Sequence, residues 1–274
     1  MPFKDILVTV PNGSEADAGG DYALSMGRAL EAHVTAVTFA LEPSISFPAF
    51  GDLPAKLLRQ HREAALKEAK VIATRFDEAA RRVGVRAVHA IKPATVSQAA
   101  STLGDLARTF DLTILAQSQP GIGHFGDLFA EAALFHSGRP VVIVPTRHRS
   151  EFSLERVLIA WDGSLHAARA VASAMPFISL AAEIGVVIVR EERKASRVDA
   201  SELLRHLQQH GLLATVSTRD EVDIPTTIAM EAEAWRASVL IMGAYGHSRI
   251  REMAFGGVTR FMLTAARIPT VMVH

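Results

Sequence analysis

The sequence has no cysteine among its 274 residues. This absence excludes disulfides, thiolate metal sites and cysteine nucleophiles, and we expect a cytoplasmic protein. Net charge is also lacking, because 29 Lys and Arg residues balance 29 Asp and Glu residues. That balance gives no overall electrostatic attraction to nucleic acid or to an anionic membrane, so neither is an expected partner.

Long apolar runs are absent as well. No stretch approaches the roughly 18 residues that a membrane-spanning helix needs. The first residues, Met1 to Ile6, lack a basic region followed by an apolar stretch, so we expect no signal peptide. What is present is a composition of 49% hydrophobic and 21% charged residues, which is typical of a globular protein with a substantial core.

Short apolar runs alternate with longer amphipathic stretches along the chain. This alternation predicts crossover connections and a mainly parallel sheet. The strand runs are apolar throughout, as a sheet covered on both faces requires. We predict an α/β fold with strands at 6–10, 33–39, 86–90, 112–116 and 141–145, and helices at 16–30, 54–83, 95–110 and 127–137.

The order of elements starts again after a polar linker at 146–150. The segment 157–161 repeats 6–10, 239–243 repeats 112–116, and 267–273 repeats 138–144. A repeated order predicts two homologous domains, residues 1–147 and 153–274, each with an open parallel five-stranded sheet and helices on both faces. One large doubly wound sheet is the alternative, but it does not explain the Arg and Pro residues that precede both final strands.

The first domain is longer because of an insertion within residues 40–65. Its segment 41–52 contains Phe47 and Phe50 and is interpreted either as a partner surface or lid, or as a cover over the first domain's own site. The final strands, 141–145 and 270–274, would be sheet edges, which need covering. They could pair within one chain as a pseudo-dimer, and a homodimer is also open.

Two segments of the second domain carry chemistry. The first is the strand 157–161 followed by Asp162, Gly163 and Ser164. A carboxylate after a parallel strand lies where open α/β sheets bind ligands, and it can accept hydrogen bonds from a ribose hydroxyl or an adenine amine. Either Ser164 or Asp162 can cap the helix that follows.

The second segment runs from Met242 to Thr259 and is rich in glycine. Glycines let the backbone approach a phosphate closely, and the following helix start adds free N–H donors and partial positive charge. Thr259 offers a hydroxyl to a phosphate oxygen. Arg249 and Arg251 lie between and would either bind phosphate or face solvent.

These residues resemble the universal stress protein family, strongly in the second domain and more weakly in the first. Gly243, Gly246 and Gly256 fit the family's Gly-x2-Gly-x9-Gly spacing, and Asp162 matches its early aspartate. The resemblance implies a Rossmann-like fold of the adenine nucleotide alpha hydrolase type and a regulatory role in the stress response. It also implies ATP as ligand, accompanied by Mg²⁺, with at most slow hydrolysis.

By position, the resemblance carries over a set of nucleotide-binding residues. After the last glycine, however, this chain has Gly257 where the ATP-binding members have Ser or Thr. One lost hydrogen bond to a charged group is worth about 1.5–3 kcal/mol at most, so we expect weakened rather than abolished binding. A residue that ends the second strand, Ile188 or Val189, would pack on adenine. The remaining residues are Ala160, Asp162, Met242, Gly243, Gly246, Gly256, Gly257, Val258 and Thr259.

The first domain has changed at the matching positions. Its turn at 11–14 lacks the aspartate and is predicted to be one residue longer, while Ala116, Gln119 and Asp127 stand in the three glycine positions. A carboxylate at Asp127 would repel a triphosphate, so we expect no nucleotide there. The segment 121–126 is a literal Gly-x-Gly-x-x-Gly, but it follows the fourth strand rather than the first, which disfavours a dinucleotide site.

Histidines give weaker signals. Glu202, His206 and His210 share one predicted helix face in a geometry that a metal could use, but exposed faces often carry such residues and we predict no metal site. His166 and His247 could line the nucleotide site or be ordinary polar loop residues. No Ser/His/Asp triad follows from the spacing.

The leading hypothesis is therefore a regulatory module that binds ATP in its second domain and acts on an unidentified protein partner. Two alternatives remain. One is a nucleotide-free interaction scaffold whose sites have decayed in both domains. The other is an adenylyl-transferring ligase on a related fold, which would need a catalytic motif that the sequence does not show.

Overall fold

A computed structural model describes residues 3–11, 17–42, 55–117, 125–191, 198–244 and 257–274. Strands and helices alternate through both halves of the chain, as expected. None of the helices in these ranges is long and apolar enough to cross a membrane. The segment 41–52 lies almost wholly outside the described residues, so the two interpretations of it stay open.

The first half comprises β1 (Asp5–Thr9), α1 (Ala18–Leu30), β2 (His33–Leu41), α2 (Ala55–Val83), β3 (Ala87–Ala94), α3 (Val96–Ala107), β4 (Leu112–Ala116), α4 (Phe125–His136) and β5 (Val141–Val144). The second half comprises β6 (Arg156–Ala160), α5 (Leu165–Ile178), β7 (Glu183–Glu191), α6 (Ser201–Gln209), β8 (Ala214–Glu221), α7 (Ile224–Ala234), β9 (Val239–Gly243), α8 (Gly257–Ala265) and β10 (Thr270–Val273).

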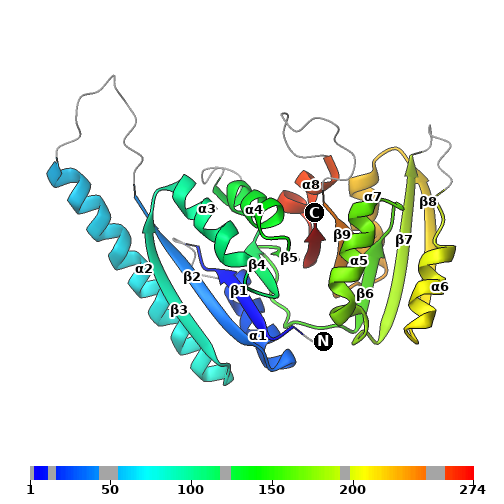
Figure 1. The fold of residues 1–274 in the computed structure, drawn as a ribbon, viewed down its shortest axis with the longest axis horizontal. Coiled ribbons are helices and arrows are strands. Elements are labelled where there is room, and N and C mark those ends of the chain that lie inside the picture. Colours follow the sequence, from blue (N-terminus) through cyan, green and yellow to red (C-terminus); the bar gives the residue numbers. More distant parts are fainter. Residues whose placement is uncertain (1–2, 12–16, 43–54, 118–124, 192–197, 245–256) are drawn as a thin grey trace.

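The strands form one ten-stranded sheet in the order β3-β2-β1-β4-β5-β10-β9-β6-β7-β8 (Figure 1). Every described pair of neighbours is parallel except β5 and β10, which run antiparallel with Val142 opposite Val271. The halves thus repeat one strand order about a pseudo-two-fold axis between β5 and β10. The predicted pairing of the two final strands is found, and it joins the two five-stranded parallel sheets into one.

The helices form two layers, one on each face of this sheet. Buried apolar residues of α1, α2, α5 and α6 pack on one face. Those of α3, α4, α7 and α8 pack on the other. Both core clusters include residues from the two halves, so each layer is continuous across the β5–β10 junction.

The linker between the halves is anchored by aromatic packing. Phe152, only 9% exposed, lies with its ring centroid 5.7 Å from that of Tyr22 in α1 and 5.6 Å from that of Phe177 in α5. The Phe3 ring also meets Phe177, at 4.7 Å. The linker therefore contacts both halves through a shared aromatic cluster.

Several boundaries differ from the predictions, most clearly those of β3 and α3. Strand β3 continues beyond residue 90 to Ala94, through Pro93, because β3 lies at the edge of the sheet, where a missing N–H is tolerated. Helix α3 ends at Ala107 rather than near residue 110.

Candidate functional site

The sheet changes direction between β6 and β9, which are neighbours. From β6 the chain passes through α5 to β7 on one side, whereas from β9 it passes through α8 to β10 on the other. Because α5 and α8 cover opposite faces, a crevice opens beyond the carboxyl ends of these two strands. Open α/β sheets bind their ligands at such a switch point.

A cavity occupies this crevice. Its empty volume is about 740 Å³, which includes open solvent at its mouth. Residues from strand ends, helix starts and one connecting turn surround it. They are Ala160, Trp161, Asp162, Ser164, Val187, Val189, Ile224, Ile228, Met242, Gly243, Gly257, Val258 and Thr259.

The turn after β6 holds the cavity's carboxylate. The Ser164 backbone N–H donates to Asp162 Oδ1 at 2.9 Å, and Gly163 between them has a φ of +72°, which favours glycine. The Ser164 hydroxyl accepts from the Ala167 N–H at 3.1 Å and so caps α5. Ser164 is thus the capping residue, while Asp162 closes the turn and lies at the cavity wall.

An apolar wall faces this turn. Val187 and Val189, two residues apart on β7, point to the same face, and Ile224 and Ile228 lie on the first turns of α7. Ile188 does not line the cavity: it is 2% exposed and packs in the core on the opposite face. Of the two residues predicted to pack on adenine, Val189 thus lines the cavity and Ile188 does not, because successive strand residues alternate between faces.

Four residues that line the cavity were not predicted from the sequence, namely Trp161, Val187, Ile224 and Ile228. The alternation of β7 would have found Val187 once Val189 was chosen. The start of α7 also carries a usable signal, since Asp223 caps it by accepting from the Thr226 N–H at 3.3 Å and Pro225 follows within the first turn.

Helix α8 supplies the third side of the cavity. Its first described residues, Gly257, Val258 and Thr259, line the space, and the N–H groups of a first helical turn have no intrahelical acceptor. Ala160, Met242 and Gly243 lie at the strand ends between these walls, as predicted. Gly246, Arg249, Arg251, His247 and Gly256 lie outside the described residues.

Gly243 also has a packing role. A Cβ atom at this position would lie 2.6 Å from both the Ala167 nitrogen and the His166 carbonyl carbon, at the start of α5. Only glycine permits this approach of helix to strand. The His166 ring packs near that of His274, at 4.9 Å, and His166 is not among the residues that line the cavity.

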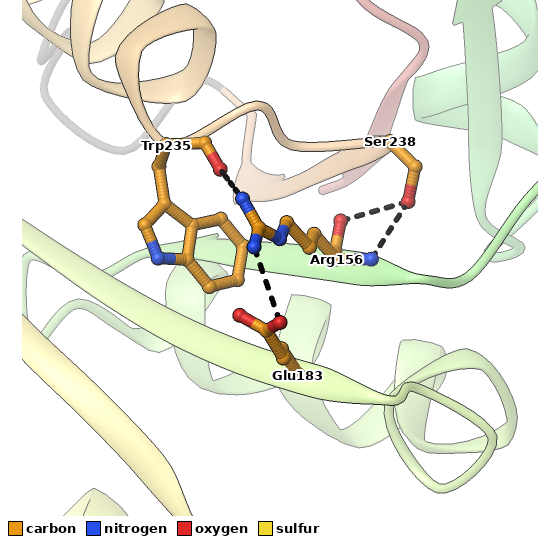
Figure 2. Close-up of polar contacts among 4 residues, drawn as sticks. All are labelled: Arg156, Glu183, Trp235 and Ser238. Atoms are coloured by element: carbon orange, nitrogen blue, oxygen red, sulfur yellow. Dashed lines mark hydrogen bonds and ion pairs between the residues drawn. The ribbon is translucent and has the colours of Figure 1, made fainter.

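Side-chain contacts at the amino ends of the second-half strands hold the elements that form two of these walls. The Arg156 guanidinium donates to the Trp235 carbonyl at 3.3 Å and pairs with Glu183 at 3.2 Å (Figure 2). The Ser238 hydroxyl donates to the Arg156 carbonyl at 2.8 Å and accepts from its N–H at 3.1 Å. These contacts tie the end of α7 to the starts of β6 and β7.

Two positions of the first half that match cavity-lining residues of the second half carry aromatic rings. The first paired residues of β1 and β2 are Asp5 and His33, and those of β6 and β7 are Arg156 and Glu183. Phe39 follows His33 at the same distance in sequence as Val189 follows Glu183, so the two are equivalent. Phe129 and Val258 lie at the same distance in sequence before the proline that precedes the last strand of their half, so these two residues are also equivalent. The two rings lie 5.5 Å apart, and Phe39 is 5% exposed.

The first-half turn also differs, by more than predicted. Eight residues separate β1 from α1, whereas four separate β6 from α5, so the turn is longer by four residues rather than one. Asp17 replaces Ser164 as the helix cap and accepts from the Gly20 N–H at 2.9 Å. Burial raises the pKa of Asp17 to about 6, against the opposing effect of this hydrogen bond.

Among the described residues, no group of three His, Asp or Glu side chains is placed to hold a metal. His206 and His210 do lie close, with ring centroids 4.9 Å apart, but Glu202 forms an ion pair with Arg205 at 2.8 Å. His210 is the residue that caps the end of α6.

Comparison with known proteins agrees with this architecture. Residues 153–274 match the family model described as "Universal stress protein family". No curated protein matches the sequence.

Solved structures extend the likeness to the whole chain. A universal stress protein from Archaeoglobus fulgidus DSM 4304 covers 97% of both chains at 15% identity and a TM-score of 0.71. A protein described as a universal stress protein from Pseudomonas aeruginosa UCBPP-PA14 covers 99% of this chain and 93% of its own, at 12% identity and a TM-score of 0.60.

A shorter universal stress protein, solved in complex with cAMP, covers 53% of this chain and 99% of its own at 16% identity and a TM-score of 0.36. The likeness to the two longer structures shows the fold, and the family model adds sequence evidence for residues 153–274. Residues 153–274 therefore belong to the universal stress protein family, and the chain as a whole shares the fold of the two longer structures.

Proposed function

We propose that the protein is a stress-response regulator that binds ATP in the second-half cavity, within a two-domain chain divided at 1–147 and 153–274. The observation that carries this proposal is the arrangement of the cavity itself. A carboxylate, an apolar wall and a helix start surround one space at the switch point of the sheet. Each of these matches one part of an adenine nucleotide.

The base would lie between Val187 and Val189 on one side and Ile224 and Ile228 on the other. Asp162 would accept hydrogen bonds from the ribose hydroxyls. The phosphates would face the first turn of α8, where N–H groups without intrahelical acceptors and the helix dipole favour negative charge. A magnesium ion would arrive with the triphosphate and be held mainly by phosphate oxygens.

Hydrolysis would be slow at most. Among the described residues that line the cavity, Asp162 is the only titratable side chain, and its place beside the ribose keeps it from activating water near the terminal phosphate. Occupancy of the cavity would instead act as a signal, by changing the protein's shape or its interaction with a protein partner.

The experiment that tests this is calorimetric titration of ATP and Mg²⁺ into the nucleotide-stripped chain and two variants. Asp162→Asn keeps an acceptor for the Ser164 N–H but removes the charge, and should weaken binding by about ten- to a hundredfold. Val189→Phe copies Phe39 of the first half and should block the base while preserving the melting temperature. Val216→Phe, an exposed change on the neighbouring strand β8, is the matched control.

One equivalent of ATP per chain, lost in Val189→Phe and retained in Val216→Phe, is the expected result. Two equivalents would contradict the assignment of the first half as unable to bind. No heat and no thermal shift at millimolar ATP would refute the nucleotide proposal.

A nucleotide-free scaffold is the second candidate, and one observation favours it. Gly243 is needed where α5 approaches β9, whether or not a phosphate binds. The presence of this glycine therefore gives less support to a ligand than its place in the family motif suggests. The titration above decides between the two candidates.

A further inference from the structure

The first half contacts the wall of the second-half cavity through helix α8. The first turn of this nine-residue helix lines the cavity. The last carbonyl groups of any helix lack intrahelical donors and need partners from elsewhere. The last turn of α8 contains no basic side chain that could supply one.

Gln117, which follows β4 in the first half, supplies that donor. Its side-chain Nε2 donates to the Ala266 carbonyl at 2.9 Å and lies 3.5 Å from the Met262 carbonyl oxygen. Ala266 and Met262 are 5% and 1% exposed, so water has little access to replace this bond. The Gln117 backbone is itself fixed in the sheet, because its N–H donates to the Val144 carbonyl at 2.8 Å.

Among the described residues, the second half makes no equivalent side-chain hydrogen bond to the end of α4. Ala244 stands at the position of Gln117 in the second half and makes the same backbone bond, to Val273 at 2.8 Å, but its methyl group cannot donate. The end of α4 is held within its own half instead. The Ser137 hydroxyl donates to the Ala133 carbonyl, and Arg108 Nε donates to the His136 carbonyl at 2.7 Å.

We propose that Gln117 is a positioning residue through which the first half holds α8 and thereby sets the affinity of the second-half cavity. A half that we expect to bind no nucleotide itself would in this way have a role in ligand binding. The effect on affinity rests on the proposed nucleotide site, whereas the effect on α8 does not.

The test uses Gln117→Leu, which preserves bulk but removes the donor, and Ser137→Ala as the matched control on the sister helix α4. Hydrogen–deuterium exchange of the ligand-free full chain reports on each helix, and ATP titration reports on the cavity. We expect Gln117→Leu to speed exchange in α8 and to weaken ATP binding about three- to tenfold, as loss of one hydrogen bond would. Ser137→Ala should speed exchange in α4 and leave ATP affinity unchanged.

Unchanged exchange of α8 in Gln117→Leu would overturn the proposal. Faster exchange with unchanged ATP affinity would also overturn it, as would an equal loss of affinity in Ser137→Ala, which would indicate general destabilisation. If the unaltered chain binds no ATP, the nucleotide proposal fails separately, and exchange of α8 alone then decides whether Gln117 holds the helix.

Discussion

Single side chains distinguish the cavity of the second half from the matching region of the first half. Where the second half has Val189 and Val258 beside its cavity, the first half has Phe39 and Phe129 in contact with each other. Two aromatic rings take up the volume in which a base would lie. Side-chain volume at these two positions therefore adds to the missing aspartate as a reason to expect no nucleotide in the first half.

Asp17 gives a prediction on pH at the same scale. Its pKa rises from 3.8 to about 6 on folding because burial disfavours the charged form. Between these pH values the folded protein keeps a proton that the unfolded chain has released. The contribution of Asp17 to stability is thus complete below a pH near 4 and is lost as pH rises through 6.

Asp17→Asn, which is neutral at every pH and keeps an acceptor for the Gly20 N–H, should therefore be more stable than the unaltered chain at pH 7.5. The gain should be about 1–3 kcal/mol and should vanish near pH 4. Urea unfolding at both pH values measures it. Asp223→Asn, at the exposed cap of α7, is the control, and a gain that does not depend on pH would contradict the burial argument.

Part of the site could be predicted at this scale, and part could not. Asp162 and Met242 to Gly243 could be placed because a strand followed by a turn fixes their position at the sheet edge. The sequence could not decide between Ile188 and Val189, because a strand buried on both faces carries no polar residue to mark which side faces the ligand. The aromatic filling of the first half depends on a contact between β2 and α4, which are far apart in sequence.

At the scale of elements, the contact between β9 and α5 makes a prediction about glycine. The close approach at Gly243 is matched in the first half by the reverse arrangement, with Ala116 on the strand and Gly19 on the helix, where a Cβ would lie 3.3 Å from the Ala116 nitrogen. The glycine thus lies on the strand in the second half and on the helix in the first half.

Gly243→Ala should therefore destabilise the ligand-free protein by about 2–3 kcal/mol, because its methyl group would overlap the backbone of His166 and Ala167. Ala116→Gly, which only removes a methyl group, should cost about 0.5–1 kcal/mol. Urea unfolding without nucleotide compares the two. A neutral Gly243→Ala that lost only ATP affinity would show that the glycine serves the ligand rather than the helix.

Elements were predicted more completely than side-chain contacts. Continuous apolar runs and repeated order sufficed for two five-stranded parallel sheets, although the ranges of β7 and β8 were not predicted. Lengths of turns were less accessible: the first turn of the first half proved four residues longer than its counterpart, because glycine, serine and acidic residues are compatible with many turn lengths.

At the scale of the whole molecule, the β5–β10 pair makes one chain resemble a symmetric dimer. Thr270, Val271 and Met272 lie opposite Ile143, Val142 and Val141. All six residues are buried. Taken alone, residues 153–274 would present β10 as an uncovered apolar edge, and such an edge tends to pair with another strand.

This fragment should therefore form a dimer in which β10 pairs antiparallel with its copy. Val142 is the first-half equivalent of Val271, so the two-fold register would place Val271 opposite Val271 of the second copy. Residues directly opposite in an antiparallel pair have Cα atoms about 4.5–5.5 Å apart, within the range that a disulfide spans. Because the chain has no cysteine of its own, Val271→Cys reports this contact alone.

Under mild oxidation, the Val271→Cys fragment should become a covalent dimer on a non-reducing gel, with the mass of a dimer by light scattering before oxidation. The full chain with the same change should stay uncrosslinked, because Val142 occupies the facing position there. A fragment that is folded but monomeric would show that an uncovered β10 does not pair with a second copy. A full chain that crosslinks as readily as the fragment would show that β5 does not protect β10 in the intact protein.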